Sequence, residues 1–177
     1  MACDLTVGII PRSLAVPHPL TILCIDDNLL TLAIRKAMLE SRDYRVFTAD
    51  NGPAGLEIAN REQIDVVILD YNMPGMDGGA IAQEMRSKHP DVAILLLSGF
   101  PSKIPESLLS IVDGFIYKGS SPTILLQELQ RATTARRQRP ERMSRTSDYS
   151  RKQVEQCRRM IASSRQSLRY SRRTRKR

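Results

Sequence analysis

The stretch VVILDYNMPGMDG, residues 66–78, begins with four consecutive apolar residues and then places Asp70 directly after them. An apolar run of this kind is typical of a strand that is buried on both faces of a parallel sheet. The runs ILCI at 22–25 and VAILLL at 92–97 have the same character, and each is also followed directly by a polar residue. These three runs predict the centre of a parallel β-sheet.

Two weaker strands and five helices complete the pattern between residues 20 and 135. The expected strands are Thr21–Ile25, Arg45–Ala49, Val66–Leu69, Val92–Leu97 and Phe115–Tyr117, and the expected helices are Leu29–Glu40, Pro53–Glu62, Gly78–Lys88, Pro105–Val112 and Pro122–Thr134. On the first helix, Leu30, Ile34, Ala37 and Met38 lie on one face. Five consecutive strand–helix units predict a doubly wound α/β domain. The handedness of the crossovers favours a flavodoxin-like five-stranded parallel sheet of order 2-1-3-4-5, with its site at the carboxyl ends of the strands.

Strongly polar residues stand where the predicted strands end. Asp26 and Asp27 follow the first strand, Asp70 ends the third, Ser98 the fourth and Lys118 the fifth. In a doubly wound sheet these ends lie along one edge, so we expect the five side chains to gather there. Three carboxylates repel one another, and a hard divalent cation such as Mg²⁺ relieves the repulsion. A carboxylate beside Mg²⁺, a lysine and a hydroxyl is well placed to attack a phosphoryl group and to hold the product.

The residues Asp26-Asp27, Asp70 within LDYNMPGMDG, Ser98-Gly99 and Lys118 together resemble the receiver domain of two-component response regulators. The resemblance covers about residues 20–135. It implies a cytoplasmic phosphorelay protein that takes a phosphoryl group onto Asp70 from a histidine kinase or phosphotransfer protein and signals to an unidentified downstream protein by contact. It also implies that the domain is no enzyme beyond its own phosphorylation and dephosphorylation.

The resemblance assigns each matching acidic position a role. Asp70 would be the phospho-acceptor, a catalytic position that also belongs to the metal site. Asp27 would bind Mg²⁺ directly, and Asp26 would act mainly through metal-bound water. Asn72 would offer its backbone carbonyl to the same ion.

The remaining positions that match the family would bind the phosphoryl oxygens or change conformation when the phosphoryl group is present. Ser98 and Lys118 would contact those oxygens, and Phe115 would turn inward as Ser98 moves, so that Ser98 and Phe115 form the expected switch. Family members commonly have a proline directly after the lysine, where this chain has Gly119. Because Pro101 and Pro105 follow Ser98 closely, we expect the fourth helix to be short or irregular.

Plainer interpretations exist for each residue alone. Paired aspartates often cap the next helix, as Asp27 could do, and Phe115 alone is more typical of a core residue. A dehalogenase-type phosphatase would need an aspartate two residues after the nucleophile, where Asn72 stands. A glycine-rich phosphate loop is missing after the first strand, which argues against nucleotide or flavin binding.

The charge divides the chain into two unlike parts. Residues 136–177 carry 16 Lys and Arg against 3 Asp and Glu, whereas residues 1–135 carry 11 against 16. An acidic domain at 20–135 is therefore followed by a basic, partly helical tail at 136–177. Residues 1–19 contain three prolines and are expected to form a disordered leader. No apolar run approaches the roughly 18 residues of a membrane span, and the three scattered cysteines fit a reducing cytoplasm.

The tail repeats every seven residues. Arginine recurs at 151, 158, 165 and 172, and an apolar residue recurs at 154, 161 and 168. This pattern predicts one helix with a narrow apolar stripe, and Ser150 with Gln153 is expected to cap its start.

The function of the tail stays open at this point. The apolar stripe favours a helix that extends the last helix of the domain, or that docks on a partner or a second copy. The basic charge favours an arm that binds nucleic acid or another polyanion, which would make the protein a phosphorylation-gated nucleic-acid-binding protein. A membrane-surface helix needs a wider apolar face. A tail folded back on the acidic domain would make phosphorylation a release signal.

Overall fold

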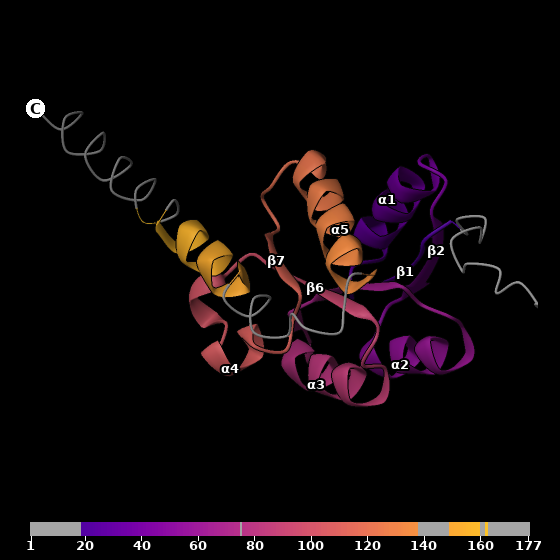
Figure 1. The fold of residues 1–177 in the computed structure, drawn as a ribbon, viewed down its shortest axis with the longest axis horizontal. Helices are drawn as coiled ribbons and strands as arrows, with labels where there is room; N and C mark the ends of the chain where they lie inside the picture. Colours follow the sequence, from indigo (N-terminus) through magenta and orange to yellow (C-terminus); the bar gives the residue numbers. More distant parts are fainter. Residues whose placement is uncertain (1–18, 75, 138–148, 160–161, 163–177) are drawn as a thin grey trace, which may run out of the picture.

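The computed structural model describes residues 19–74, 76–137, 149–159 and 162. A five-stranded sheet lies at the centre of this part (Figure 1). Its strands are β1 (Thr21–Ile25), β2 (Arg45–Ala49), β3 (Val66–Asp70), β6 (Ala93–Ser98) and β7 (Gly114–Tyr117). All neighbours pair in parallel in the order β2-β1-β3-β6-β7, which confirms the predicted flavodoxin-like topology. The short strands β4 (Asn72–Met73) and β5 (Met76–Asp77) pair separately and antiparallel.

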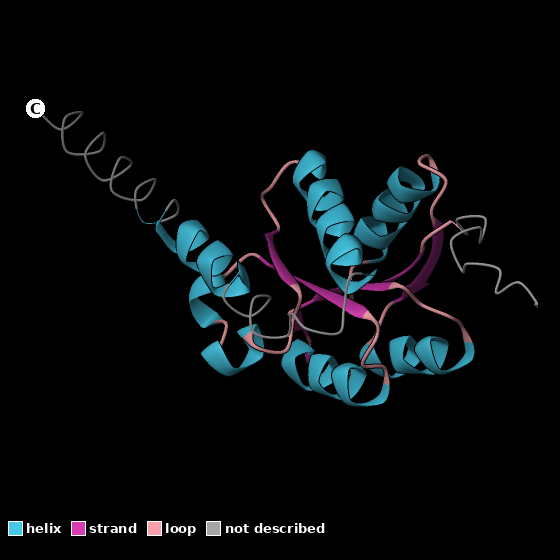
Figure 2. Cartoon of the chain, viewed as in Figure 1, coloured by secondary structure: helices cyan, strands magenta, loops and turns pink. Residues whose placement is uncertain are grey.

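Helices cover both faces of the sheet (Figure 2). They are α1 (Leu29–Glu40), α2 (Gly52–Arg61), α3 (Gly78–Lys88), the 3-10 turn η2 (Pro101–Lys103), α4 (Glu106–Leu109) and α5 (Pro122–Arg137). Figure 1 shows α1 and α5 on one face and α2, α3 and α4 on the other. The expectation of a short fourth helix is confirmed, since α4 has only four residues.

Alternate residues of the central strands build two separate cores. Leu23, Val67 and Ile94 belong to the cluster that α2, α3 and α4 complete, and Ile22 and Ile68 belong to the cluster that α1 and α5 complete. All five side chains are fully buried. The prediction of strands buried on both faces is therefore confirmed, and the carboxyl ends of these strands are held by two packed layers.

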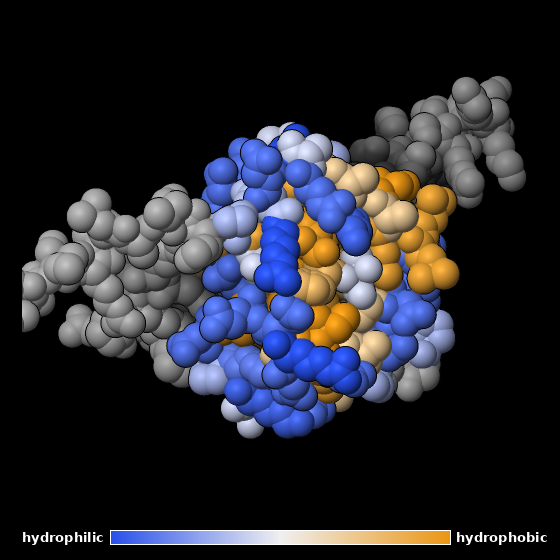
Figure 3. All heavy atoms as spheres, turned by 90° about the vertical axis from the view of Figure 1, so that its right-hand side faces the viewer, coloured by the Kyte–Doolittle hydropathy of each residue, from blue (hydrophilic) through white to orange (hydrophobic). Residues whose placement is uncertain are grey.

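Helix α1 buries a different face from the one that carries most of its apolar residues. Leu32 and Leu39 face the sheet, whereas Leu30 and Ile34 are 70% and 62% exposed. Figure 3, which views the side of the molecule that carries α1, β2 and α2, shows apolar residues gathered within a mostly polar surface. Leu29 is exposed as well, so the start of α1 presents apolar side chains to solvent.

Residues 149–159 form a helix that lies beside α4 (Figure 1, yellow). The prediction of a helical tail is confirmed for this range. The expected cap is wrong, because Ser150 lies within the helix and its hydroxyl donates to the carbonyl of Val112, while Gln153 accepts from the amide of Phe115. The proposed leader, apart from Pro19, and the tail repeats beyond 162 lie outside the described residues. In the part that is described, no helix combines the length and apolar character needed to cross a membrane.

Candidate functional site

Three carboxylates meet at the carboxyl edge of the sheet. Asp26 directly follows β1, Asp27 comes next, and Asp70 is the last residue of β3. Each offers an oxygen, and these oxygens all lie within 4.8 Å of one another. Asp26 and Asp70 are buried, whereas Asp27 is exposed. Carboxylate oxygens at this spacing, open to solvent on one side, suit a hard cation such as Mg²⁺.

The cap of α1 bears on the role of Asp27. Asn28 is the N-cap residue, and its side chain accepts a hydrogen bond from the amide of Thr31 at 2.9 Å. The plain interpretation of Asp27 as a helix cap is therefore wrong. Asp26 supports the same turn, because its Oδ1 accepts from the amide of Asn28 at 3.0 Å.

Two cations face the buried acids. Lys118 Nζ lies 2.6 Å from Asp70 Oδ2 and 3.5 Å from Asp26 Oδ2. Arg35, on the buried face of α1, lies 3.4 Å from the same oxygen of Asp26. The sequence analysis missed Arg35, although its place between Leu32 and Leu39 at helical spacing was a usable signal. These cations compensate part of the charge that burial would otherwise make costly.

Opposing effects act on the pKa of the Asp70 carboxylate. Burial raises the pKa of Asp70 above its ordinary value, while the hydrogen bond from Lys118 and the backbone amide of Asn72 act in the opposite direction. The Asn72 amide donates to Asp70 Oδ1 at 3.1 Å. Both oxygens of Asp70 thus have partners within the protein.

Ser98 and Phe115 lie on the neighbouring strands β6 and β7. Ser98 Oγ accepts from the side-chain amide of Asn72 at 3.3 Å and from the backbone amide of Phe100 at 3.0 Å. The carbonyl of Ser98 accepts from the amide of Lys118 at 3.1 Å. Phe115 is 2% exposed and packs in the core on the α2, α3 and α4 side. Ser98 therefore contacts Asn72 beside the acidic pocket, whereas Phe115 is directed inward, into the core.

The glycine after Lys118 has a local structural reason. A Cβ on Gly119 would overlap Cε1 of the Tyr117 ring. The ring of Tyr117 therefore occupies the space that a side chain at 119 would need, and Lys118 reaches Asp70 without the proline that is common in the resembling family.

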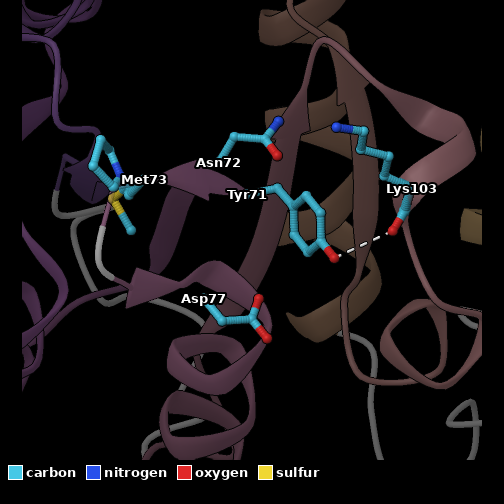
Figure 4. A pocket seen from close by; sticks show the side chains of 6 residues that line it. Tyr71, Asn72, Met73, Asp77 and Lys103 are labelled. Carbon is cyan, nitrogen blue, oxygen red and sulfur yellow. Dashed lines mark hydrogen bonds between the residues drawn. The ribbon is translucent and has the colours of Figure 1, made fainter.

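A second hollow adjoins the acidic pocket and was not predicted from the sequence. It is lined by Tyr71, Asn72, Met73, Pro74, Asp77 and Lys103 (Figure 4). The hydroxyl of Tyr71 donates to the carbonyl of Lys103 at 3.2 Å. Burial, with a smaller contribution from Asp77, raises the pKa of Tyr71. Tyr71, the residue after Asp70, is thereby tied to η2.

Residues 22–130 match the response regulator receiver domain family. The chain belongs to this family. Among similar receiver-containing proteins, the putative two-component response regulator ARR13 of Arabidopsis thaliana is 34% identical over 123 residues, which are 67% of this chain and 22% of ARR13. The nitrate/nitrite response regulator NarL of Escherichia coli is 31% identical over 119 residues, 65% of this chain and 55% of NarL. The chain spans only about a fifth of the length of ARR13.

Solved receiver structures show the same fold. The response regulator TrrA of Thermotoga maritima, solved in complex with Mg²⁺ and BeF, has a TM-score of 0.58 and 28% identity, and the match covers 64% of this chain and 98% of TrrA. TrrA in complex with the histidine kinase ThkA gives a TM-score of 0.59 at 28% identity, covering 64% of this chain and 97% of TrrA. A receiver domain protein of Methanospirillum hungatei, at 21% identity and a TM-score of 0.61, supports the fold alone.

Proposed function

We propose that this receiver domain accepts a phosphoryl group on Asp70 from a histidine kinase or phosphotransfer protein, with Mg²⁺ in the acidic pocket, and passes the signal on by protein contact. The observation that carries the proposal is the 2.6 Å contact of Lys118 with Asp70, inside a cluster of three carboxylates. We place the activity in the cytoplasm, because Cys24 and Cys157 are free thiols and a reducing compartment keeps thiols in that state.

The proposed metal site uses oxygens that the fold brings together. The carboxylates of Asp26, Asp27 and Asp70 and the backbone carbonyl of Asn72 would hold Mg²⁺. Mg²⁺, when bound, neutralises negative charge on the carboxylates and on an incoming phosphoryl group. Exposed Asp27 gives solvent access to the site, and Arg35 already balances part of the charge of Asp26.

The transfer itself is a substitution at phosphorus. A carboxylate oxygen of Asp70 forms the new bond to phosphorus, and the bond from phosphorus to the leaving group breaks with its electron pair passing to that group. The product is an acyl phosphate. Lys118 exchanges its contact with Asp70 for one with a phosphoryl oxygen, and the hydroxyl of Ser98 donates to another.

The start of α1 provides a surface for the phosphodonor. Leu29, Leu30 and Ile34 are exposed and lie on the helix that begins two residues after Asp27. Exposed apolar side chains gathered in one place are typical of protein contact sites. A kinase that docks there would bring its phosphohistidine to the open side of the acidic pocket.

Intact mass spectrometry after incubation with acetyl phosphate tests the proposal. The wild-type chain should gain one phosphoryl group, and only with Mg²⁺ present. Asp70→Asn should gain none, whereas Asp91→Asn, which removes an exposed carboxylate in the turn before β6, should behave as wild type. Undiminished uptake by Asp70→Asn would overturn the assignment.

A further inference from the structure

The helix at residues 149–159 covers the edge strand β7 and the segments beside it. Val154 is 1% exposed and belongs to the same core cluster as Phe115. Ser150 is fully buried, and its hydroxyl donates to the carbonyl of Val112 at 3.1 Å. A segment that buries an aliphatic residue in the core of the domain is docked on it and does not merely lie nearby.

The same helix is fastened to α5 at its start. The hydroxyl of Tyr149 donates to Glu128 Oε1 at 2.8 Å, and the guanidinium of Arg131 lies 3.7 Å from the centre of the Tyr149 ring. Stacking of a guanidinium on an aromatic ring adds to the attraction of such a contact. Glu128 and Arg131 also pair with each other at 2.9 Å.

The other end of the helix holds the segment between β6 and α4. Arg158 donates from Nε to the carbonyl of Pro101 and from a terminal nitrogen to the carbonyl of Ile104, each at 3.2 Å. Arg151 and Arg158 also approach the carboxylate of Glu106 at 3.5 and 3.8 Å. The basic side chains of this stretch therefore face acidic and carbonyl groups of the chain's own domain.

These anchors lie close to the groups that must respond to a phosphoryl group. The amide of Phe115, three residues before Lys118, donates to Gln153 Oε1 at 2.9 Å. Ser98 Oγ accepts from the amide of Phe100, whose neighbour Pro101 carries the carbonyl that Arg158 binds. One anchor thus sits on β7, which Lys118 directly follows, and another sits just after Ser98.

We propose that residues 149–159 act as an intramolecular latch that phosphorylation of Asp70 opens. In its closed state the latch occupies the face formed by η2, α4, β7 and α5 and excludes partner proteins from that face. This inference rests on the proposed function of Asp70. A phosphoryl group adds nearly two negative charges and draws Lys118 and Ser98 toward itself. Movement of their strands disturbs the hydrogen bonds of the latch, which depend on distance and angle.

Cys157 provides the probe. It packs against the core cluster, partly buried, and burial raises its pKa. Cys24 is fully buried and burial raises its pKa to about 12, so it stays unreactive in the folded protein. In a Cys3→Ser background, the rate of alkylation by iodoacetamide, followed by intact mass, therefore reports how often the latch is open.

Three variants of the full chain show how the alkylation rate of Cys157 depends on opening of the latch. Val154→Asp should raise the alkylation rate of Cys157 by about tenfold or more, because a carboxylate cannot remain unpaired in the core. Gln156→Asp introduces the same charge at an exposed position of the same helix, next to Cys157, and should not raise the rate. Gln153→Ala removes the acceptor for Phe115 without adding charge and should give a smaller increase. Circular dichroism checks that each variant remains folded.

The second part of the experiment measures the effect of phosphorylation on the alkylation rate. Wild type treated with acetyl phosphate and Mg²⁺ should show faster alkylation of Cys157 in proportion to the phosphorylated fraction, and Asp70→Asn should not. If untreated wild type reacts as fast as Val154→Asp, the latch is not closed and the inference is wrong. If wild type is phosphorylated without any change in rate, the segment is a fixed cover and the coupling is wrong. If no phosphoryl group is taken up, the proposed function fails and the coupling with it, while the comparison of variants still decides whether the segment is closed.

Discussion

Lys118 Nζ lies 2.6 Å from Asp70 Oδ2, although Lys118 directly follows β7 and Asp70 ends β3, with β6 between the two strands. The lysine therefore reaches across β6 to the carboxylate of Asp70. Lys118 is 35% exposed, whereas Asp70 is 1% exposed. The exposed partner can follow an incoming phosphoryl group while the buried one remains in place, which is the arrangement that the proposed transfer to Asp70 requires.

Replacing Lys118 tests its part in the transfer. Lys118→Met keeps the apolar stem but removes the charge that faces the phosphoryl oxygens. We expect phosphoryl uptake from acetyl phosphate to slow by about 10²-fold, the usual loss when one preorganised electrostatic group is removed. Lys103→Met, a change of the same kind at the last residue of η2, should have little effect. Equal rates for Lys118→Met and wild type would show that the ion pair has no role in the transfer.

Binding of Mg²⁺ should stabilise the folded chain. At a free concentration of 100 times its dissociation constant, a ligand that binds only the folded state raises the free energy of unfolding by about 2.7 kcal/mol. Thermal melts of wild type and Asp91→Asn should therefore shift upward with Mg²⁺. Asp27→Asn should lose most of that shift, since the exposed carboxylate supplies a charged ligand. A shift of the same size in Asp27→Asn would place the cation elsewhere.

The raised pKa of Asp70 predicts a pH-dependent cost of folding. Its ordinary pKa is 3.8, and burial raises the pKa in the folded chain. A carboxyl group of this kind favours folding at pH values below its unfolded pKa, and that contribution is lost as the pH rises through the folded pKa. Without Mg²⁺, Asp70→Asn should therefore have a larger free energy of unfolding than wild type at neutral pH.

Urea denaturation at a series of pH values measures this difference. The advantage of Asp70→Asn should shrink as the pH falls toward the ordinary pKa of aspartate, because the wild-type carboxyl group is then protonated. A less stable Asp70→Asn at neutral pH would mean that the contact with Lys118 outweighs the cost of burial.

The two faces of α1 should differ in how much they contribute to the free energy of unfolding. Leu32→Ala should lower the free energy of unfolding by about 2–5 kcal/mol, as is usual when a buried leucine is truncated. Leu30→Ala makes the same change on the exposed face and should alter it by less than about 0.5 kcal/mol. Chemical denaturation measures the free energy of unfolding of both variants. A larger loss for Leu30→Ala than for Leu32→Ala would contradict the structure.

The sequence was sufficient for the sheet because fully buried parallel strands have an unambiguous pattern. Residues 22–25, 66–69 and 92–97 read as continuous apolar runs, and the polar residues after them fall at one edge by topology alone. Asp26, Asp27, Asp70, Ser98 and Lys118 could therefore be predicted as neighbours.

Other features depend on competition between alternatives that a sequence does not rank. Helix α1 has apolar residues on two faces, and only packing decides that Leu32 and Leu39 face the sheet while Leu30 and Ile34 face solvent. Arg35 was missed because a buried cation is recognised only once its partner Asp26 is placed beside it.

The tail is another case in which the sequence alone does not rank the alternatives. Its seven-residue period predicted a helix but not the surface that the helix contacts, because Val154 would fit many apolar sites equally well. The contacts of Ser150 and Gln153 with the domain replaced the expected helix cap. Polyanion binding or self-association through residues 136–177 stays a prediction, although Arg151 and Arg158 already face Glu106.

Locating the phosphoryl group on the chain tests the central claim most directly. Borohydride reduces an acyl phosphate of aspartate to homoserine, so reduction after treatment with acetyl phosphate and Mg²⁺ leaves a permanent mark at the acceptor. Peptide mass spectrometry should find homoserine at position 70 and not at 26 or 27. A mark at another aspartate, or none in a chain whose intact mass shows the added group, would contradict the assignment of Asp70 as the acceptor.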